Sequence, residues 1–423
     1  MAAIRVPPLP FRQHSLGNGL QLLLHSDRRF PQVHISLYYR VGSSYEVPGR
    51  SGLAHLFEHM MFQGSARVPK NEHGRLVDEA GGRWNASTNK DRTNYYNTVP
   101  SNALELALWL EAERMSSLEV TDETFENQRQ TVLEERKQSY ENRPYGPSFL
   151  RFDELAYTNW AYGHSIIGDV SDLESLDLES AQAFHRTHYG PGNCVLAMAG
   201  DFDPDTGLQL VEDHFGEIED GTESLLPDLR EPAQEAERIE VVGDRLAALP
   251  AVSIGYRIGT LASDDYYIFS VLALIVAGGD SSRLCRRLIF EKNWITDLYA
   301  GPNQYRGPQV FRLWFQLQSG IDWQTVVDAI EEEFAQIGRE GVSVEELEMA
   351  KNQLAHRFVG RLSTVSQVGE LLNYYAVYHN DPDRLNRDLD RFLAVDSDAI
   401  REAVTRRLRR DSRTLLVTEV ESQ

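Results

Sequence analysis

The sequence predicts an α+β fold of two homologous domains, each a mainly antiparallel β-sheet with helices packed against it. Short alternating and β-branched runs are interleaved with helical patterns, which is typical of mixed folds. An internal repeat indicates two domains: HISLYYRVGS at 34–43 matches AVSIGYRIGT at 251–260, at an offset of 217 residues (251 − 34). A helical pattern follows both segments, and each half closes with a strand-like run, at 193–199 and 413–420. Two matches in the same order indicate a duplicated domain.

Local patterns predict the elements of the first half in chain order. The runs at 11–16 and 20–25 flank Gly17-Asn18-Gly19, in which Asn-Gly favours the positive φ of a tight hairpin. β-Branched residues or strict alternation predict two further strands, at 33–41 and 94–99. Apolar residues at helical spacing predict three helices, at 53–62, 103–115 and 122–140. Thr121 and Asp122 are the two candidates for the N-cap of the third helix.

The boundary between the two domains follows from composition. Residues 217–237 are rich in Glu, Asp and Pro and contain few large apolar residues, which is typical of a linker. We therefore predict an N-terminal domain over 1–216, an acidic linker over 217–237 and a C-terminal domain over 238–423. The 423 residues allow two or three domains at about 150 residues each, and the repeat favours two.

Charge and composition exclude several classes of protein. The formal net charge of −22 disfavours a nucleic-acid partner, which needs a basic surface. The longest apolar stretch, 268–277, is about half of the ~20 residues that a membrane span requires. Cys194 and Cys285 form neither a disulfide framework nor a zinc ribbon. With no apolar signal segment at the N-terminus, these features favour the cytoplasm; the periplasm is the alternative if a signal peptide has been removed.

The strongest chemical signal is HLFEH at residues 55–59. Positions i and i+4 share one face of a helix, so His55 and His59 can bind one ion while Glu58 projects beside it. Two histidines plus a carboxylate, with one position left open, is the pattern of a catalytic zinc site. Glu134 and Glu135 on the third predicted helix are candidates for the third ligand. Adjacent helical residues point about 100° apart, so only one of the two can face the metal, and spacing alone does not choose between them.

With these residues the sequence resembles the pitrilysin/insulysin family of inverted zinc metallopeptidases, in the short-chain branch that includes the mitochondrial processing peptidases. The family motif is His-x-x-Glu-His followed about 76 residues later by a ligand Glu, and the interval from His59 to Glu135 is 76 residues (135 − 59). The resemblance therefore selects Glu135 over Glu134. Further matching blocks lie along the first half: GGRWNAST at 81–88, NRPYG at 142–146, YGH at 162–164 and IG at 167–168.

The resemblance implies a function and a role for each residue of the motif. His55, His59 and Glu135 would hold one Zn²⁺ per chain, with no other cofactor. Glu58 would take a proton from the attacking water and pass it to the leaving amine. The implied function is a zinc metalloendopeptidase that hydrolyses peptides or short unfolded polypeptides. The alternative is a non-catalytic relative that serves as a scaffold or assembly subunit, although such relatives typically lose ligands and this chain keeps all four residues.

The resemblance also implies how substrate is held. Asn85 and Ala86 match the family's edge strand, which binds the substrate backbone by β-augmentation. Single-chain members carry four such repeats around a chamber, so two repeats would form half of a clamshell chamber that a dimer completes. In many members a Glu stands seven residues before the ligand Glu, whereas this chain has Gln128, which predicts weaker zinc binding.

The second half departs further from the family pattern. At the repeat offset, the three motif positions fall on aliphatic residues, which excludes a second zinc site: Leu272, Ile275 and Val276. Active members carry a substrate-contacting Arg/Tyr pair after a Ser-Ser-Arg-Leu segment, and here those positions are Ile289 and Thr296. We therefore predict the zinc-bearing subunit of a heterodimer whose homologous partner supplies the pair; a homodimer is the alternative. In an alignment shifted by a residue or two, neighbouring side chains would compensate: Arg286, Arg287 and Tyr299.

Overall fold

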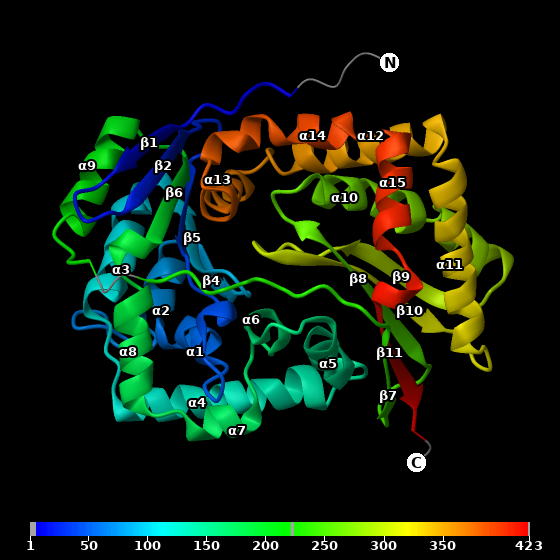
Figure 1. The fold of residues 1–423 in the computed structure, drawn as a ribbon. Helices are drawn as coiled ribbons and strands as arrows, with labels where there is room; N and C mark the ends of the chain where they lie inside the picture. The colour runs from blue at the N-terminus through cyan, green and yellow to red at the C-terminus, as the bar shows by residue number, and fades with distance from the viewer. Residues whose placement is uncertain (1–5, 221–223, 422–423) are drawn as a thin grey trace. The chain divides into compact units, whose positions relative to one another are not determined.

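The computed structural model describes residues 6–220 and 224–421, which form two compact units, each built around one β-sheet (Figure 1). Three segments make up unit 1: Met1–Glu135, His164–Asp228 and Val359–Asn386. The other three make up unit 2: Arg136–Gly163, Leu229–Phe358 and Arg387–Gln423. Each unit therefore contains one segment that comes from the opposite half of the sequence.

Unit 1 contains a six-stranded sheet in the order β1-β2-β6-β3-β5-β4. All neighbouring strands are antiparallel except β2 and β6, which are parallel. The strands are β1 (Arg12–Ser15), β2 (Gln21–Ser26), β3 (Gln32–Tyr39), β4 (Arg83–Thr88), β5 (Thr93–Pro100) and β6 (Cys194–Gly200). Gly19 adopts the positive φ of 88° that the hairpin signal predicts between β1 and β2.

Helices cover both faces of this sheet. The helices of unit 1 are α1 (Leu53–Met60), α2 (Glu72–Glu79), α3 (Leu104–Ser117), α4 (Asp122–Arg136), α7 (Val170–Ser175), α8 (Leu178–His188), α9 (Pro204–Phe215) and α13 (Val365–His379). On one face, alternate β3 residues such as Leu37 and Tyr39 are fully buried towards the helices of the N-terminal half. On the other face, α13 from the C-terminal half packs on β3 and β6.

A partly buried carboxylate with four hydrogen-bond partners joins α13 to the sheet of unit 1. Glu370 accepts hydrogen bonds from four side chains: Ser36 Oγ at 2.6 Å, Tyr38 OH at 2.7 Å, Asn94 Nδ2 at 3.1 Å and His34 Nε2 at 3.2 Å. These donors hold the pKa of Glu370 below its usual value, although burial alone would raise it. The Glu370 side chain stays 28% exposed, and its four partners on β3 and β5 make α13 an integral part of unit 1.

Unit 2 contains a five-stranded sheet in the order β7-β11-β8-β10-β9. Its strands are β7 (Arg238–Asp244), β8 (Ala251–Thr260), β9 (Ile295–Pro302), β10 (Pro308–Leu317) and β11 (Arg413–Val420). Its helices are α5 (Gly146–Ala156), α6 (Trp160–Gly163), α10 (Asp264–Ala277), α11 (Trp323–Glu340), α12 (Val344–Gly360, whose last residues belong to unit 1), α14 (Asp388–Ala394) and α15 (Ser397–Arg407). Only β7 and β11 pair in parallel. Both sheets are thus mixed and mainly antiparallel, which confirms the predicted α+β class.

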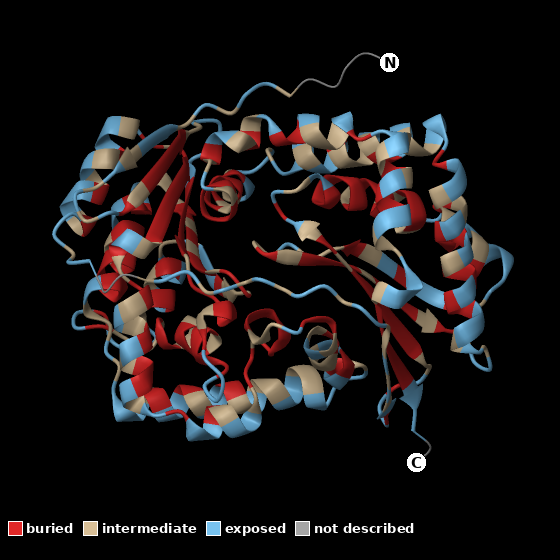
Figure 2. Ribbon diagram, viewed as in Figure 1, coloured by how far each residue is buried: buried red, intermediate tan, exposed pale blue. Residues whose placement is uncertain are grey.

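The two sheets share one strand order once β1 is set aside. In each, the first strand pairs in parallel with the last, the repeat strand lies at the centre, and a hairpin forms the far side. The repeat residues Tyr39 and Tyr256 occupy corresponding places on β3 and β8 and are both buried. Figure 2 shows the buried sheets, and α10 contributes Leu272, Ile275 and Val276 to the buried residues of unit 2. This shared topology is what a duplicated domain predicts.

The exchanged helices follow the same repeat. In unit 2, α5 from the N-terminal half packs on β7, β8 and β11, where Phe152 joins a buried cluster with Val310 and Leu416. In unit 1, α13 has the corresponding place on its sheet. The two helices begin at residues 146 and 365, an offset close to that of the sequence repeat.

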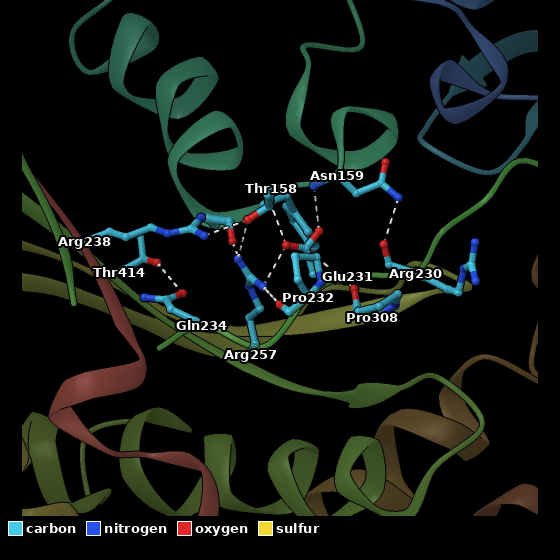
Figure 3. Close-up of polar contacts among 12 residues, drawn as sticks. Thr158, Asn159, Arg230, Glu231, Pro232, Gln234, Arg238, Arg257, Pro308 and Thr414 are labelled. Carbon is cyan, nitrogen blue, oxygen red and sulfur yellow. Dashed lines mark hydrogen bonds and ion pairs between the residues drawn. The ribbon is translucent and has the colours of Figure 1, made fainter. Parts of the chain in front are cut away.

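Part of the predicted acidic linker is firmly bound to unit 2. Residues 221–223 of that linker lie outside the described residues, and the chain enters unit 2 at Leu229. Figure 3 shows Glu231 accepting the backbone N–H groups of Thr158 and Asn159, at 2.7 and 2.8 Å, and pairing with Arg257 at 2.7 Å. The Glu231 side chain is only 3% exposed. This acidic residue therefore forms a buried ion pair within unit 2 and is not part of the solvent-exposed acidic surface.

None of the helices within the described ranges combines the length and apolar character that crossing a membrane requires.

Candidate metal centre

The predicted motif lies on α1, a short helix with one apolar face. Leu56, Phe57 and Met60 are fully buried, and Phe57 packs on Tyr189 with ring centroids 5.4 Å apart. The Tyr95 hydroxyl on β5 donates a hydrogen bond to the Phe57 carbonyl at 2.9 Å. Burial of this face turns the opposite face, which carries the two histidines and Glu58, away from the core.

The predicted third ligand comes from α4, which is longer and mostly polar. Thr121 Oγ1 accepts the backbone N–H of Thr124 at 3.3 Å, so Thr121 is the N-cap of the two candidates. The predicted helix over 122–140 is observed as α4 continued by a π-helical turn, Lys137–Glu141. Buried Val132 faces the core, while Glu135 turns to the histidines of α1 and Glu134 is exposed.

The ligand atoms of His55, His59 and Glu135 lie close together. The Glu135 Oε2 atom lies 3.2 Å from His59 Nε2 and 3.8 Å from His55 Nε2, and all three ligand atoms lie within 4.8 Å of one another. Zn–N bonds of about 2.0–2.1 Å in a tetrahedron place ligand atoms roughly 3.3 Å apart, so this donor set fits a zinc ion. Within the described part of the chain, no other group of His, Cys, Asp or Glu meets the same geometric test.

The pKa shifts of His55 and Glu135 favour the binding of a cation near neutral pH. Burial together with the nearby His59 lowers the pKa of His55 to about 4, although Glu135 acts in the opposite direction, so the His55 ring is neutral near neutral pH and offers a lone pair. The hydrogen bond with His59 holds the pKa of Glu135 below its usual value, which keeps this group a carboxylate. The second ring nitrogen of His55, Nδ1, is buried, and no described residue forms a hydrogen bond with it.

Glu58 lies beside the three ligand atoms but is not one of them. Burial raises the pKa of Glu58, whereas Thr88, His59 and Arg92 act in the opposite direction. A carboxylate with a raised pKa holds a transferred proton more readily than a solvated one, which suits a general base. Arg92 is anchored by hydrogen bonds to the Ser87 carbonyl at 2.6 Å and to Asn94 Oδ1 at 2.9 Å.

The predicted substrate strand, β4, lies at the edge of the unit 1 sheet next to α1. It pairs with β5, and no described strand pairs with its other edge. Asn85 is exposed, and its side-chain oxygen accepts the backbone N–H of Ala86 at 2.9 Å, so this N–H points away from β5. Next to β4, residues from the strand, from α2 and from the segment between α1 and α2 line a hollow of about 540 Å³: Phe62, Asn71, Gly74, Arg75, Asp78, Glu79 and Trp84.

The structure also describes the residues at which the sequence departs from the family pattern, one on α4 and two in unit 2. Gln128 is buried on α4, and its amide donates to Asn127 Oδ1 at 3.0 Å. In unit 2, Ile289 is partly buried and Thr296 is exposed on β9. A shifted alignment would use three other residues of unit 2. Of these, Arg286 pairs with Glu291 at 3.6 Å, Arg287 pairs with Glu332, and Tyr299 is 57% exposed.

Sequence reasoning missed several residues that hold α1 in place. Tyr95 supports the middle of the helix, and Glu46 binds its first backbone N–H groups. His164, which contacts Glu46, belongs to the matching block YGH, but the block itself does not reveal this contact. A residue before a helix can be read as a cap only within a few positions, and Glu46 stands outside that window.

Comparisons with known proteins agree with this geometry. The family model described as insulinase (peptidase family M16) matches residues 21–168, and the peptidase M16 inactive domain matches residues 175–354. The zinc protease PqqE of Helicobacter pylori is 28% identical over 393 residues, which cover 92% of this chain and 88% of that protein. The crystal structure of a protease from Helicobacter pylori superposes with a TM-score of 0.93 at 26% identity, covering 98% of this chain and all of that one.

A more distant relative supports the predicted branch. The β subunit of the mitochondrial-processing peptidase of Bos taurus is 29% identical over 202 residues, which cover 48% of this chain and 41% of that protein. The two family models match consecutive parts of the chain and leave only its ends and a short gap uncovered. The chain therefore belongs to the insulinase family of peptidases, peptidase family M16.

Proposed function

We propose that this chain, a zinc protease of peptidase family M16, is an endopeptidase that hydrolyses peptides or short unfolded polypeptides with one Zn²⁺ per chain. The observation that carries the proposal is the convergence of the ligand atoms of His55, His59 and Glu135 beside Glu58. A scaffold protein has no need of this arrangement, because a structural zinc site usually closes all four positions, often with Cys.

The residues of unit 1 divide the chemistry between them. Zn²⁺, when bound by the three ligands, supplies a Lewis acid that polarises a peptide carbonyl and lowers the pKa of a water molecule. Glu58 accepts the proton of the attacking water through its carboxylate and passes it to the nitrogen of the departing amine. Its partial burial favours the first step, since a carboxylate of raised pKa is a stronger base than a solvated one.

Metal removal tests this function directly. The purified protein is expected to contain one equivalent of zinc by elemental analysis and to cleave an unstructured fluorogenic peptide. Chelation should abolish cleavage because no other described cluster can hold the ion, and added Zn²⁺ should restore it. Cleavage that persists at full rate in protein shown to be zinc-free would contradict the proposal.

The peptide backbone is proposed to pair with the free edge of β4. An extended peptide placed there can accept a hydrogen bond from the Ala86 N–H, which the Asn85 side chain occupies in the free protein. The hollow beside Trp84 and Phe62 lies next to this edge and is suited to a side chain of the bound peptide. Specificity then comes from backbone pairing together with this shallow hollow.

Replacing Ala86 with Pro removes one outward-facing N–H from β4. We expect KM for peptides to rise by about fivefold, the loss of a hydrogen bond of ~1 kcal/mol, with zinc content unchanged. The matched control is Asn85→Ala, which removes the competing acceptor but leaves the Ala86 N–H available, so its KM should not rise. An unchanged KM in a zinc-loaded Ala86→Pro protein would argue against pairing at this edge.

The active assembly is proposed to be a heterodimer in which a homologous subunit supplies an Arg/Tyr pair. Ile289 and Thr296 can provide neither a guanidinium nor a phenol, and Arg287 is paired with Glu332. The chain would then be the zinc-bearing half of a chamber, which a homodimer could close only without the pair. If a coexpressed homologous chain that carries the pair leaves the peptidase rate unchanged, the homodimer becomes the better explanation.

A further inference from the structure

The first turn of α1 is held by a side chain that plays no part in the proposed chemistry. Glu46, in the loop before α1, accepts the Gly52 N–H on Oε2 at 2.9 Å and the Ala54 N–H on Oε1 at 2.8 Å. An α-helix leaves its first four N–H groups unpaired, and Glu46 satisfies two such groups at the start of α1. Ala54 directly precedes His55, so this carboxylate fixes the backbone next to a metal ligand.

Glu46 is itself held from a segment more than a hundred residues further along the chain. His164 Nε2 lies 3.0 Å from Glu46 Oε2, and the two side chains are 2% and 0% exposed. The ammonium group of Lys90 donates a hydrogen bond to the His164 carbonyl, which fixes the backbone at that point. Because both side chains are buried, moving either one would break their contact and raise the free energy of the folded protein.

The same distant segment makes a second polar contact with the start of α1. Asp172 Oδ2 accepts both the Ser51 N–H, at 3.0 Å, and the Ser51 hydroxyl, at 2.7 Å. The Ser51 hydroxyl oxygen in turn accepts the Asp169 N–H at 2.9 Å. Ser51, the residue before the N-cap of α1, is therefore hydrogen-bonded both to α7 and to the residue that precedes α7.

A third contact is steric and needs no charge. Gly52 and Gly168 both adopt positive φ, 92° and 84°, and their backbones touch. A Cβ atom added at Gly168 would lie 2.7 Å from Gly52 Cα and 2.7 Å from the Ser51 carbonyl oxygen. Contacts that short do not persist, so any side chain at 168 must push the start of α1 away from its present position.

We propose that Glu46 and residues 164–172, which we call the α1 brace, position His55 and His59 for metal binding. Helix α1 has only eight residues, too few to be stable alone, and a zinc site tolerates ligand distances only within about 0.2 Å. The brace therefore sets the zinc affinity of the chain without touching the ion. This inference rests on the proposed zinc site, so the wild-type protein must first be shown to bind zinc.

The steric contact provides a test with a matched control. Gly168→Ala and Gly49→Ala both place a side chain at a φ of +84°, but a Cβ at Gly49 meets nothing within 4 Å. Both variants should lose stability in the zinc-free state, measured by thermal unfolding, and Gly168→Ala should lose more because its clash adds to the strain of the positive φ that both share. Only Gly168→Ala should weaken zinc affinity, by about tenfold or more in competition with a chromophoric chelator, as outer contacts of metal ligands do.

A second variant keeps the test decisive if Gly168→Ala does not fold. Glu46→Gln keeps the size of the side chain but turns one acceptor into a donor, so zinc affinity should fall by about tenfold and the Ala54 amide should exchange faster in zinc-free protein. Unchanged zinc affinity in both folded variants would overturn the brace while leaving the proposed zinc site standing. Absence of zinc from the wild-type protein would instead overturn the proposed function.

Discussion

Replacing Glu58 with Gln is expected to reduce peptide cleavage by about 10²–10⁴-fold while leaving zinc bound. Glutamine has the size of glutamate, but its amide oxygen cannot take up a proton at neutral pH. The three ligand atoms belong to other residues, so the substitution removes the proton carrier and retains the metal site. The measurement is kcat for a fluorogenic peptide together with zinc content, on the same preparation.

The controls for this variant separate chemistry from packing. Glu58 is largely buried near Thr88 and Arg92, so a change in stability must be measured beside the change in rate. Thermal unfolding of the zinc-loaded variant should stay close to that of the wild-type protein. A Glu58→Gln protein that keeps its zinc and cleaves within about tenfold of the wild-type rate would rule out this residue as the general base.

Local sequence patterns predict what depends on neighbouring residues. Spacing within a few residues predicts where the repeat strands lie, the helix at 53–62 and the closeness of His55 to His59. The choice of Glu135 over Glu134 depends on tertiary packing. Both residues lie on one helix, and the burial of Val132 decides which of them turns to α1. The family resemblance makes that choice, and in the structure Glu135 is the residue that lies near the two histidines.

Contacts between distant segments lie beyond such reasoning. The sequence does not predict that the helix at 365–379 packs on the sheet of the first half, so its place in unit 1, where Glu370 joins it to the sheet, is not predicted. Composition makes 217–237 a linker, yet Glu231 is buried against Arg257 because one specific partner outweighs the average polarity of the segment. The contact of Glu46 with His164 is hidden for the same reason: it joins two loops with no shared pattern.

The reciprocal placement of α5 and α13 bears on how the unit with the metal site folds. Unit 1 needs Glu370, which follows the last residue of its sheet by 170 positions (370 − 200), before His34, Ser36 and Tyr38 are satisfied. Buried polar groups without partners are costly, so a chain cut after the first half should not fold into a stable unit 1. The second half is therefore required by the metal-binding unit although it carries no ligand of its own.

Replacing Glu135 with Gln is expected to lower zinc affinity by more than the ~10–100-fold typical of changes around a metal ligand, and to abolish cleavage. The substitution removes the only charged ligand, since His55 is neutral near neutral pH, and a neutral amide is a poor partner for Zn²⁺. The matched control is Glu134→Gln, which changes the charge by the same amount one residue away at an exposed position. Zinc affinity is measured by chelator competition, and rates are compared at saturating zinc. Loss of zinc from Glu134→Gln but not from Glu135→Gln would mean that α4 turns by about 100° in solution and presents the other carboxylate.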